Sequence, residues 1–283
     1  MLFSLFINSL PSVLKCKYQL YADDLQIYVS GPISQVDRLV DIINRDLISI
    51  EAWTRHNMLT PNPKKTQAIV FSREGNIIPQ NDIVFCGEPI QLSDKVTNLG
   101  LAMDKRLCWT DQVNDVVKRV YSTLRTFRRF QSVLSLATRK KLVQAVIVPL
   151  YTYCDVVYYS GLTEALKQQL HRSFKSAVRF VYGLRRRDTT EEVRHTILGR
   201  DLLDNYKLRV CCFLRRGYLR ELPPYLLQHL QPGANIRARS FVLPHHTTSS
   251  GKSVLISGAS LWNHLPLALK QKPTLTAFKS GFH

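Results

Sequence analysis

Gln19-Leu20-Tyr21-Ala22-Asp23-Asp24-Leu25-Gln26-Ile27-Tyr28-Val29 is the stretch that organises the first part of the chain. Polar and apolar residues alternate on both sides of the aspartate pair, and this period of two is typical of β-strands. The stretch therefore predicts a β-hairpin with Asp23 and Asp24 at its tip. Adjacent carboxylates repel each other unless a cation neutralises them, and oxygen ligands of this kind suit Mg²⁺. Aspartate is also a common turn residue, so a solvated turn without a metal is the alternative.

The segments around and after this pair resemble a known family. Tyr21-Ala22-Asp23-Asp24 between two apolar strands resembles the catalytic hairpin of reverse transcriptases. Downstream, the Asn62-x-x-Lys65-Thr66 pattern resembles the next motif of that family, and Asn98-Leu99-Gly100 resembles its primer grip. The order and direction of these motifs are similar to those of non-LTR (LINE-like) retrotransposons. The resemblance covers nearly the whole chain and is strongest in residues 1–110.

Weaker matches extend the resemblance toward both ends of the chain. The opening segment 2–8 looks like the helix that precedes the hairpin, although Ser9 stands where relatives usually have aspartate. Later in the chain, Tyr153-Cys154-Asp155 and Trp262-Asn263-x-Leu265-Pro266 look like the tail of those open reading frames. These matches favour one continuous segment of the same family.

The resemblance implies a site for RNA-directed DNA synthesis. In the family, carboxylates from two strands hold two Mg²⁺ ions, which activate the primer hydroxyl and stabilise the leaving oxygen. Asp23 is then the metal ligand in this chain, and Asp24 supports it. Lys65 is placed near the phosphates of the incoming nucleotide, and an exposed lysine ahead of a strand is the alternative. The substrate-binding residues implied by the same motifs are Tyr21, Ala22, Leu99 and Gly100.

The family's other metal-binding strand and its fingers would precede Met1. We therefore expect a truncated reverse transcriptase, an RNA-directed DNA polymerase by descent that is inactive as this chain. The alternative is a non-catalytic nucleic-acid-binding fragment of a decayed retroelement.

Charge divides the chain into a neutral part and a basic part. Hydrophobic residues make up 45% and charged residues 21% of the 283 residues, values that are ordinary for a folded protein. The formal net charge is +18, whereas residues 1–110 contain 11 basic and 11 acidic residues. The whole excess therefore lies in residues 111–283, which points to a polyanionic partner.

The periodicity of apolar residues changes from strands to helices at about Thr110. It predicts helices at roughly 110–127, 135–148, 163–182 and 202–219, and Thr189-x-x-Glu192 is read as a capping box. Basic residues lie largely off the apolar stripes, and the resemblance implies a thumb that holds an RNA template and a DNA primer by their phosphates. A solvated charged face is the alternative. The candidate nucleic-acid-binding residues are Arg125, Arg128, Arg129, Arg139, Lys140, Lys141, Arg185, Arg186 and Arg187.

The first part of the chain combines short strands with one long helix. A helix is predicted for residues 1–10, and another begins at Ser34 and carries an apolar stripe from Val36 to Trp53. Strands are predicted for 67–71 and 97–103, and a hairpin for 83–92 with its turn at Gly87-Glu88-Pro89. Gly100 interrupts the last strand, where either a β-bulge or the close approach of a primer explains it.

These elements predict an α+β fold. Residues 1–110 form the C-terminal half of a polymerase palm, an antiparallel sheet with helices that holds the catalytic hairpin and the primer-grip segment. Residues 111–221 form a helical, basic, thumb-like domain, and residues 222–283 form an irregular, weakly held tail.

The cysteines and the apolar runs of the sequence indicate where in the cell the protein is expected to lie. The six cysteines lack the spacing of a metal site, so reduced thiols are expected. No apolar run reaches the ~18–20 residues of a membrane span, and the opening segment lacks the basic leader of a signal peptide. We expect an intracellular protein, in the nucleus or the cytoplasm, that binds nucleic acid and no membrane.

Overall fold

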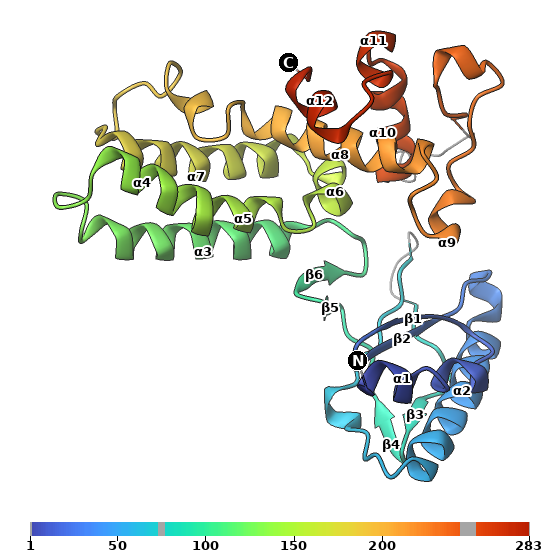
Figure 1. Ribbon diagram of the computed structural model, residues 1–283. Helices are drawn as coiled ribbons and strands as arrows, with labels where there is room; N and C mark the ends of the chain where they lie inside the picture. Colours follow the sequence, from blue (N-terminus) through green and yellow to red (C-terminus); the bar gives the residue numbers. More distant parts are fainter. Residues whose placement is uncertain (1, 73–76, 244–252, 283) are drawn as a thin grey trace. The chain divides into compact units, whose positions relative to one another are not determined.

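The computed structural model describes residues 2–72, 77–243 and 253–282 and divides into two compact units (Figure 1). Unit 1 comprises Met1–Leu107 and unit 2 comprises Cys108–His283. This boundary lies close to the predicted change from strands to helices. Unit 1 contains all the named strands of the described residues, whereas unit 2 is built from helices. The chain is therefore of mixed α and β structure, as predicted.

Unit 1 consists of two helices and three antiparallel hairpins among its described residues. The helices are α1 (Leu2–Ile7) and α2 (Val36–His56). Each hairpin is a separate two-stranded sheet. The strands pair as β1 (Lys17–Tyr21) with β2 (Asp24–Tyr28), β3 (Ile83–Phe85) with β4 (Glu88–Ile90), and β5 (Lys95–Asn98) with β6 (Leu101–Asp104).

The core of unit 1 forms on the predicted apolar stripe of α2. Leu47, Ile50 and Trp53 of this helix are buried together with Leu10, Phe85 and Ile90 from the flanking segments. Leu25 and Ile27 of β2 pack against the same cluster. The predicted scaffold role of α2 is therefore confirmed, since this helix supports both the first and the second hairpin.

A buried acid on α2 was not predicted from the sequence. The Asp46 side chain is only 1% exposed and accepts backbone hydrogen bonds from Lys15 (2.9 Å) and Cys16 (2.7 Å). Because these two N–H groups lie at the entry to β1, the carboxylate fixes the start of the first hairpin on the helix. Burial and the neighbouring Asp46 raise the pKa of the Cys16 thiol to about 12.

Three local predictions for unit 1 are wrong. Residues 67–71 form no strand and contribute only an isolated parallel bridge between Ala68 and Leu92. The turn of the second hairpin lies at Cys86-Gly87, because both residues have positive φ (52° and 77°) and Glu88 already pairs with Phe85. Ser34 does not cap α2, since it lies inside a 3₁₀ turn of residues 33–35.

Gly100 has a different role from either predicted alternative. Leu99-Gly100 is the two-residue turn between β5 and β6, and both residues have positive φ (46° and 79°). Two consecutive left-handed residues are typical of a type I′ hairpin turn, whose second position favours glycine. The predicted single strand at 97–103 is therefore a hairpin.

Unit 2 is a bundle of helices whose long members match the predicted stripes. α3 (Thr110–Arg128), α7 (Glu164–Tyr182) and α8 (Leu202–Tyr218) confirm three predicted helices. The predicted helix at 135–148 continues further, as α4 (Leu136–Leu142), a π-helical turn (Val143–Ile147) and α5 (Val148–Thr152). Pro149 cannot donate a backbone hydrogen bond, and its ring crowds the preceding turn, so the wider π turn accommodates it. Asp155–Tyr158 forms the short α6.

The capping box predicted at Thr189 does not open a helix. The hydroxyl oxygen of Thr189 accepts from the backbone N–H of Glu191 at 3.3 Å, which closes a local turn. Only a 3₁₀ turn, Arg194–Thr196, follows. Threonine side chains bond nearby backbone groups in turns as readily as at helix starts, so the same spacing fits both.

The described part of residues 222–283 is not an irregular tail, which corrects the prediction. It contains α9 (Pro224–Leu227), α10 (Val254–Asn263), α11 (Leu267–Lys270) and α12 (Leu275–Ser280), and α10 and α12 pack on α8. Trp262 and Phe278 are buried and stack with their ring centroids 6.0 Å apart. Arg215 of α8 also donates to the backbone oxygens of Lys272 (3.1 Å) and Pro273 (3.0 Å).

One described segment, Leu136–Gly161, is long and apolar enough to cross a membrane by length and composition. It joins α4, the π turn, α5 and α6, with Pro149 inside it, so it is not one uninterrupted apolar run. Arg139, Lys140 and Lys141 lie near its start, and core helices of soluble proteins meet the same criterion.

Candidate functional sites

The aspartate pair lies where β1 turns into β2. Tyr21 pairs with Asp24, so the two-residue turn consists of Ala22 and Asp23, with Ala22 at a φ of 53°. This corrects the prediction in one respect, because Asp24 is the first residue of β2 and only Asp23 lies in the turn itself. Both aspartates are exposed, and among the described residues neither carboxylate has a hydrogen-bond or ion-pair partner.

The pairing register assigns the two faces of this hairpin. Residues that pair across an antiparallel ladder lie on the same face. Tyr21, Asp24 and Gln26 therefore share one face, whereas Leu25 and Ile27 share the other. Ile27 pairs with Tyr18, and Leu25 pairs with Leu20. Both Leu25 and Ile27 lie on the face that packs on the core of unit 1, which leaves Asp24 on the opposite face.

Paired amides join the first hairpin to the third. The Gln26 side chain donates to the Asn98 side-chain oxygen, and Asn98 donates back to the Gln26 oxygen at 3.0 Å. In addition, the side-chain oxygen of Gln67 accepts from the backbone N–H of Thr97 at 3.3 Å. These contacts bring the Asn98 segment beside the aspartate hairpin, on the face that carries Asp24, and bring the residue after Thr66 beside the β5–β6 hairpin.

The remaining predicted site residues lie on turns. Leu99 and Gly100 form the tip of the β5–β6 hairpin, directly after Asn98. Lys65 is exposed and ends a 3₁₀ turn, Pro63–Lys65, whose start is capped by the Asn62 side chain accepting from Lys64 N–H at 3.1 Å. Among the described residues, no hydrogen bond or ion pair joins Lys65 to Asp23 or Asp24.

The chemistry of the aspartate pair suits a hydrated divalent cation. Two exposed carboxylates supply oxygen ligands for one Mg²⁺, which keeps several waters and binds substrate phosphates. Two metal ions about 4 Å apart require more ligands than one turn provides. Within residues 2–72, 77–243 and 253–282, no group of three or more His, Cys, Asp or Glu side chains could hold a metal.

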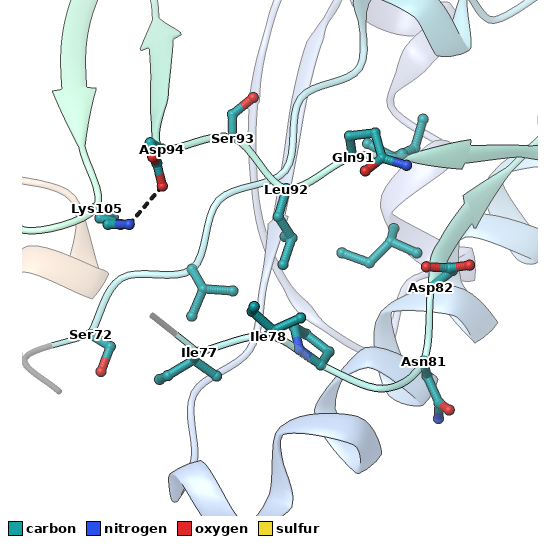
Figure 2. A pocket seen from close by; sticks show the side chains of 14 residues that line it. Ser72, Ile77, Ile78, Asn81, Asp82, Gln91, Leu92, Ser93, Asp94 and Lys105 are labelled. Carbon is teal, nitrogen blue, oxygen red and sulfur yellow. Dashed lines mark hydrogen bonds and ion pairs between the residues drawn. The ribbon is translucent and has the colours of Figure 1, made fainter. Parts of the chain in front are cut away.

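A separate hollow of about 350 Å³ lies elsewhere in unit 1 (Figure 2). Its wall mixes apolar residues such as Ile77, Ile78 and Leu92 with polar ones, and it includes the ion pair of Asp94 with Lys105 at 2.7 Å. None of the predicted site residues lines it.

In unit 2, the nine predicted nucleic-acid-binding residues gather at one end of the helical bundle, which we call the basic end. α3 and α7 finish at this end and α4 starts there (Figure 1). The rings of Phe127 and Phe180 lie 5.8 Å apart, which joins the last turns of α3 and α7. The basic end comprises Arg125, Arg128 and Arg129 on and just after α3, Arg139, Lys140 and Lys141 on α4, and Arg185, Arg186 and Arg187 after α7.

The members of the basic end differ in their roles. Arg139 donates to the backbone oxygen of Phe180 at 3.2 Å, so this side chain satisfies a carbonyl in the last turn of α7. By contrast, Arg185, Arg186 and Arg187 are all exposed. Their loop is closed by Asp188, whose carboxylate accepts from the Arg185 N–H at 2.6 Å. The structure thus brings the nine residues together but uses Arg139 as a structural anchor.

Acids are sparse around the basic end. The sequence contains no aspartate or glutamate between Asp115 and Asp155, or between Glu164 and Asp188. The helix dipoles of α3 and α7 place partial negative charge here, which offsets some of the basic charge. α4 and the loop from α7 to Asp188 contribute six of the nine cations and that loop contributes one acid, Asp188, so the basic end has a net positive charge.

A buried ion pair in unit 2 belongs to the segment Tyr153-Cys154-Asp155. The Asp155 side chain is buried at the start of α6 and accepts from Arg209 Nε at 2.9 Å. Arg209 also donates to the backbone oxygen of Thr152 at 2.6 Å. Burial raises the pKa of Asp155 to about 6, against the opposing effect of Arg209. This pair ties α6 to α8, so the sequence motif carries a structural role.

Trp262 and Asn263 also have structural roles. The Trp262 ring nitrogen donates to the Arg239 backbone oxygen at 2.6 Å. The Asn263 amide accepts from Phe241 N–H at 2.8 Å and donates to Phe241 oxygen at 2.9 Å, as a neighbouring strand would. These bonds hold the segment Arg239–Phe241 against α10. The resemblance singled out Trp262 and Asn263 in the sequence but implied none of these contacts.

Comparison of the chain with protein-family models, with curated proteins and with solved structures gave no significant match.

Proposed function

We propose that unit 1 is part of the palm of an RNA-directed DNA polymerase of the non-LTR retrotransposon type, with Asp23 as its Mg²⁺ ligand. The observation that carries this proposal is the joining of the Asp23–Asp24 hairpin to the Asn98-Leu99-Gly100 turn through the Gln26–Asn98 amide pair. In a polymerase palm, the first segment holds the metal and the second holds the primer strand. Their joining supports a common site on one face of the unit.

In this proposal the basic end of unit 2 has the role of a polymerase thumb. Its exposed arginines and lysines bind the phosphates of a template–primer duplex and position it without reading its sequence. Mg²⁺, when bound at Asp23 and Asp24, supplies charge neutralisation at the reacting phosphate. Asp24 lies on the same face of the hairpin as Gln26. Lys65, in the turn Pro63–Lys65, binds a phosphate of the nucleotide.

The proposed two-metal chemistry requires more ligands than the described residues group around Asp23 and Asp24. Asp23 and Asp24 come from a single hairpin, whereas the two-metal reaction draws carboxylates from two strands. The chain alone is therefore proposed to be inactive in DNA synthesis, and a second polypeptide segment with the other acid completes the site. The protein would act inside the cell on nucleic acid.

A second candidate function is nucleic-acid binding without catalysis. The basic end favours it, because phosphate binding there needs neither Asp23 nor a metal ion. One experiment distinguishes the two candidates. Only the first predicts that DNA synthesis, by an enzyme whose metal site has been completed with the missing ligands, depends on Asp23.

Primer extension on an RNA template tests the first candidate. We expect no extension by the chain with Mg²⁺ and nucleotides, and extension once the family's preceding palm strand and fingers are joined to it. In this joined protein, Asp23→Asn should abolish synthesis, because the neutral amide binds Mg²⁺ poorly. Asp82→Asn, at an exposed acid of the same unit, is the matched control and should leave it unchanged.

Two results would contradict the proposal. Extension by the unmodified chain would mean that its metal site is already complete. Activity of the joined protein that survives Asp23→Asn would mean that another residue binds the metal. Retained duplex binding by an inactive joined protein would favour the second candidate.

A further inference from the structure

The loop between α3 and α4, residues 129–135, exposes apolar side chains in the middle of the basic end. The side chain of Phe130 is 55% exposed, that of Val133 is 79% exposed, and that of Leu136, the first residue of α4, is 47% exposed. We call these three side chains the apolar tip. Exposed apolar groups that cluster within a charged surface are typical of interaction sites.

The backbone of this loop is held in place by hydrogen bonds. Phe130 N–H donates to Phe127 oxygen at 3.1 Å, and the Phe130 oxygen accepts from the N–H groups of Val133 (3.1 Å) and Leu134 (3.2 Å). The Gln131 side chain donates to the Phe180 oxygen at 3.2 Å, which fixes the loop to the end of α7. The apolar tip is thus presented by an ordered turn. A preorganised surface loses less conformational entropy when it binds.

The charges around the apolar tip restrict its partner. Arg128 and Arg129 precede Phe130, Lys140 and Lys141 follow one turn after Leu136, and no acid occurs between Asp115 and Asp155. Seven of the nine residues of the basic end are arginines. Arginine binds phosphate through two parallel hydrogen bonds and also stacks on flat rings, which lysine does not do. A partner with both phosphates and flat apolar rings meets these conditions.

We propose that the apolar tip binds an unpaired base of a nucleic-acid strand, with the Phe130 ring stacked on the base. Val133 and Leu136 cover the edges of the base, and the surrounding arginines hold the flanking phosphates. This inference rests on the proposed nucleic-acid binding of the basic end and adds a preference for unstacked bases over continuous duplex. Stacking on an aromatic side chain tolerates any base, so the site reads no sequence.

The test compares two labelled DNA strands of about 12 nucleotides, a length within the usual range of single-strand sites. One strand is intact, and the other has abasic residues at its centre, so both carry the same phosphates. Binding to the full-length protein is measured by fluorescence anisotropy. We expect the intact strand to bind about tenfold more tightly, since base–aromatic stacking has effects of this size.

Variants of the tip assign this preference to the ring. Phe130→Ala and Phe130→Leu should both bind the two strands equally, whereas Phe130→Trp should keep the preference. Tyr225→Ala removes an aromatic side chain that is 50% exposed outside the basic end and serves as the matched control. Circular dichroism spectra like those of the parent protein would show that the variants fold.

The possible outcomes separate this inference from the proposed function. Equal binding of intact and abasic strands by the parent protein would overturn the base site and leave phosphate binding standing. Absence of binding to either strand and to duplex would overturn both. Binding to vesicles of equal parts phosphatidylcholine and phosphatidylserine, lost in Phe130→Ala and kept in Phe130→Leu, would make the tip a lipid-binding surface and overturn the base site.

Discussion

The buried carboxylate of Asp46 shows how one residue positions the candidate catalytic hairpin. It lies on α2, a rigid helix, and accepts backbone hydrogen bonds from Lys15 and Cys16 at the entry to β1. Hydrogen bonds to a charged acceptor are roughly twice as strong as neutral ones. The aspartate pair is therefore held through the backbone by a residue that lies on a different element.

We predict that Asp46→Asn destabilises the protein by about 2–4 kcal/mol, because it removes the charge from two short hydrogen bonds and turns an amide donor toward backbone donors. Denaturant unfolding measures the loss, and faster hydrogen exchange at Lys15 and Cys16 locates it. Asp41→Asn, at an exposed position on the same helix, is the control and should cost less than about 0.5 kcal/mol. Equal effects of the two variants would contradict this role.

At the scale of elements, the β5–β6 turn contains a conflict between sequence and conformation. Leu99 adopts a φ of 46°, although a left-handed conformation costs a residue with a β-carbon roughly 1–2 kcal/mol. Asparagine or glycine would suit this position better. Strained residues of this kind cluster at functional sites. The strained backbone of Leu99 beside Asn98 fits the proposed contact of Leu99 with substrate.

Two substitutions in this turn should have opposite effects on stability. Gly100→Ala should destabilise the protein by about 1 kcal/mol, because alanine resists a φ of 79°. Leu99→Asn should stabilise it by up to about 1 kcal/mol, since asparagine tolerates the left-handed region. Thermal unfolding monitored by circular dichroism provides the measurement. Destabilisation by Leu99→Asn would show that packing of the leucine outweighs its strain.

The elements that could be predicted from sequence are those with long local patterns. α2, α3, α7 and α8 each carry an apolar stripe over several turns, so tertiary contacts only reinforce the local signal. Strands of three or four residues give little periodicity. For this reason the predicted turn of the β3–β4 hairpin is displaced, and the β5–β6 hairpin is predicted as a single strand. The helices of 222–283 depend on distant aromatic contacts, such as Trp262 with Phe278, that no local window contains.

The candidate sites show the same limit. The aspartate hairpin was predictable, because its two strands alternate around a two-residue turn. Its link to Asn98 was not, since the Gln26–Asn98 pair joins residues that lie 72 positions apart. Likewise, the nine basic residues can be named from the sequence, but only the packing of the helices brings them to one end of the bundle. The same packing places Arg139 so that its side chain donates to the Phe180 backbone oxygen.

At the scale of the whole molecule, charge separates the two units. Unit 1 contains equal numbers of acidic and basic residues, so its exposed aspartates have no large positive field of their own unit around them. Unit 2 carries the entire net charge of +18. Long-range attraction of a polyanion is therefore a property of unit 2, and it depends on ionic strength because salt screens it.

This distribution predicts a steep salt dependence for binding of the full-length protein to an RNA–DNA hybrid. If the basic end neutralises about six phosphates, affinity should fall roughly a thousandfold between 50 and 200 mM salt. Replacing Arg185, Arg186 and Arg187 by glutamine should reduce the number of released counterions by about three, and with it the slope of affinity against salt. Anisotropy titrations of labelled hybrid at several salt concentrations measure both quantities.

A matched triple variant distinguishes a local interface from diffuse attraction. Glutamine at Arg216, Arg220 and Arg237 removes the same charge from exposed positions outside the basic end. If the basic end binds the phosphates directly, this variant should keep the parent slope, because only ions displaced at the contact enter it. Equal losses in both triple variants would mean that the duplex is attracted by net charge alone, and the basic end would then be an ordinary solvated surface.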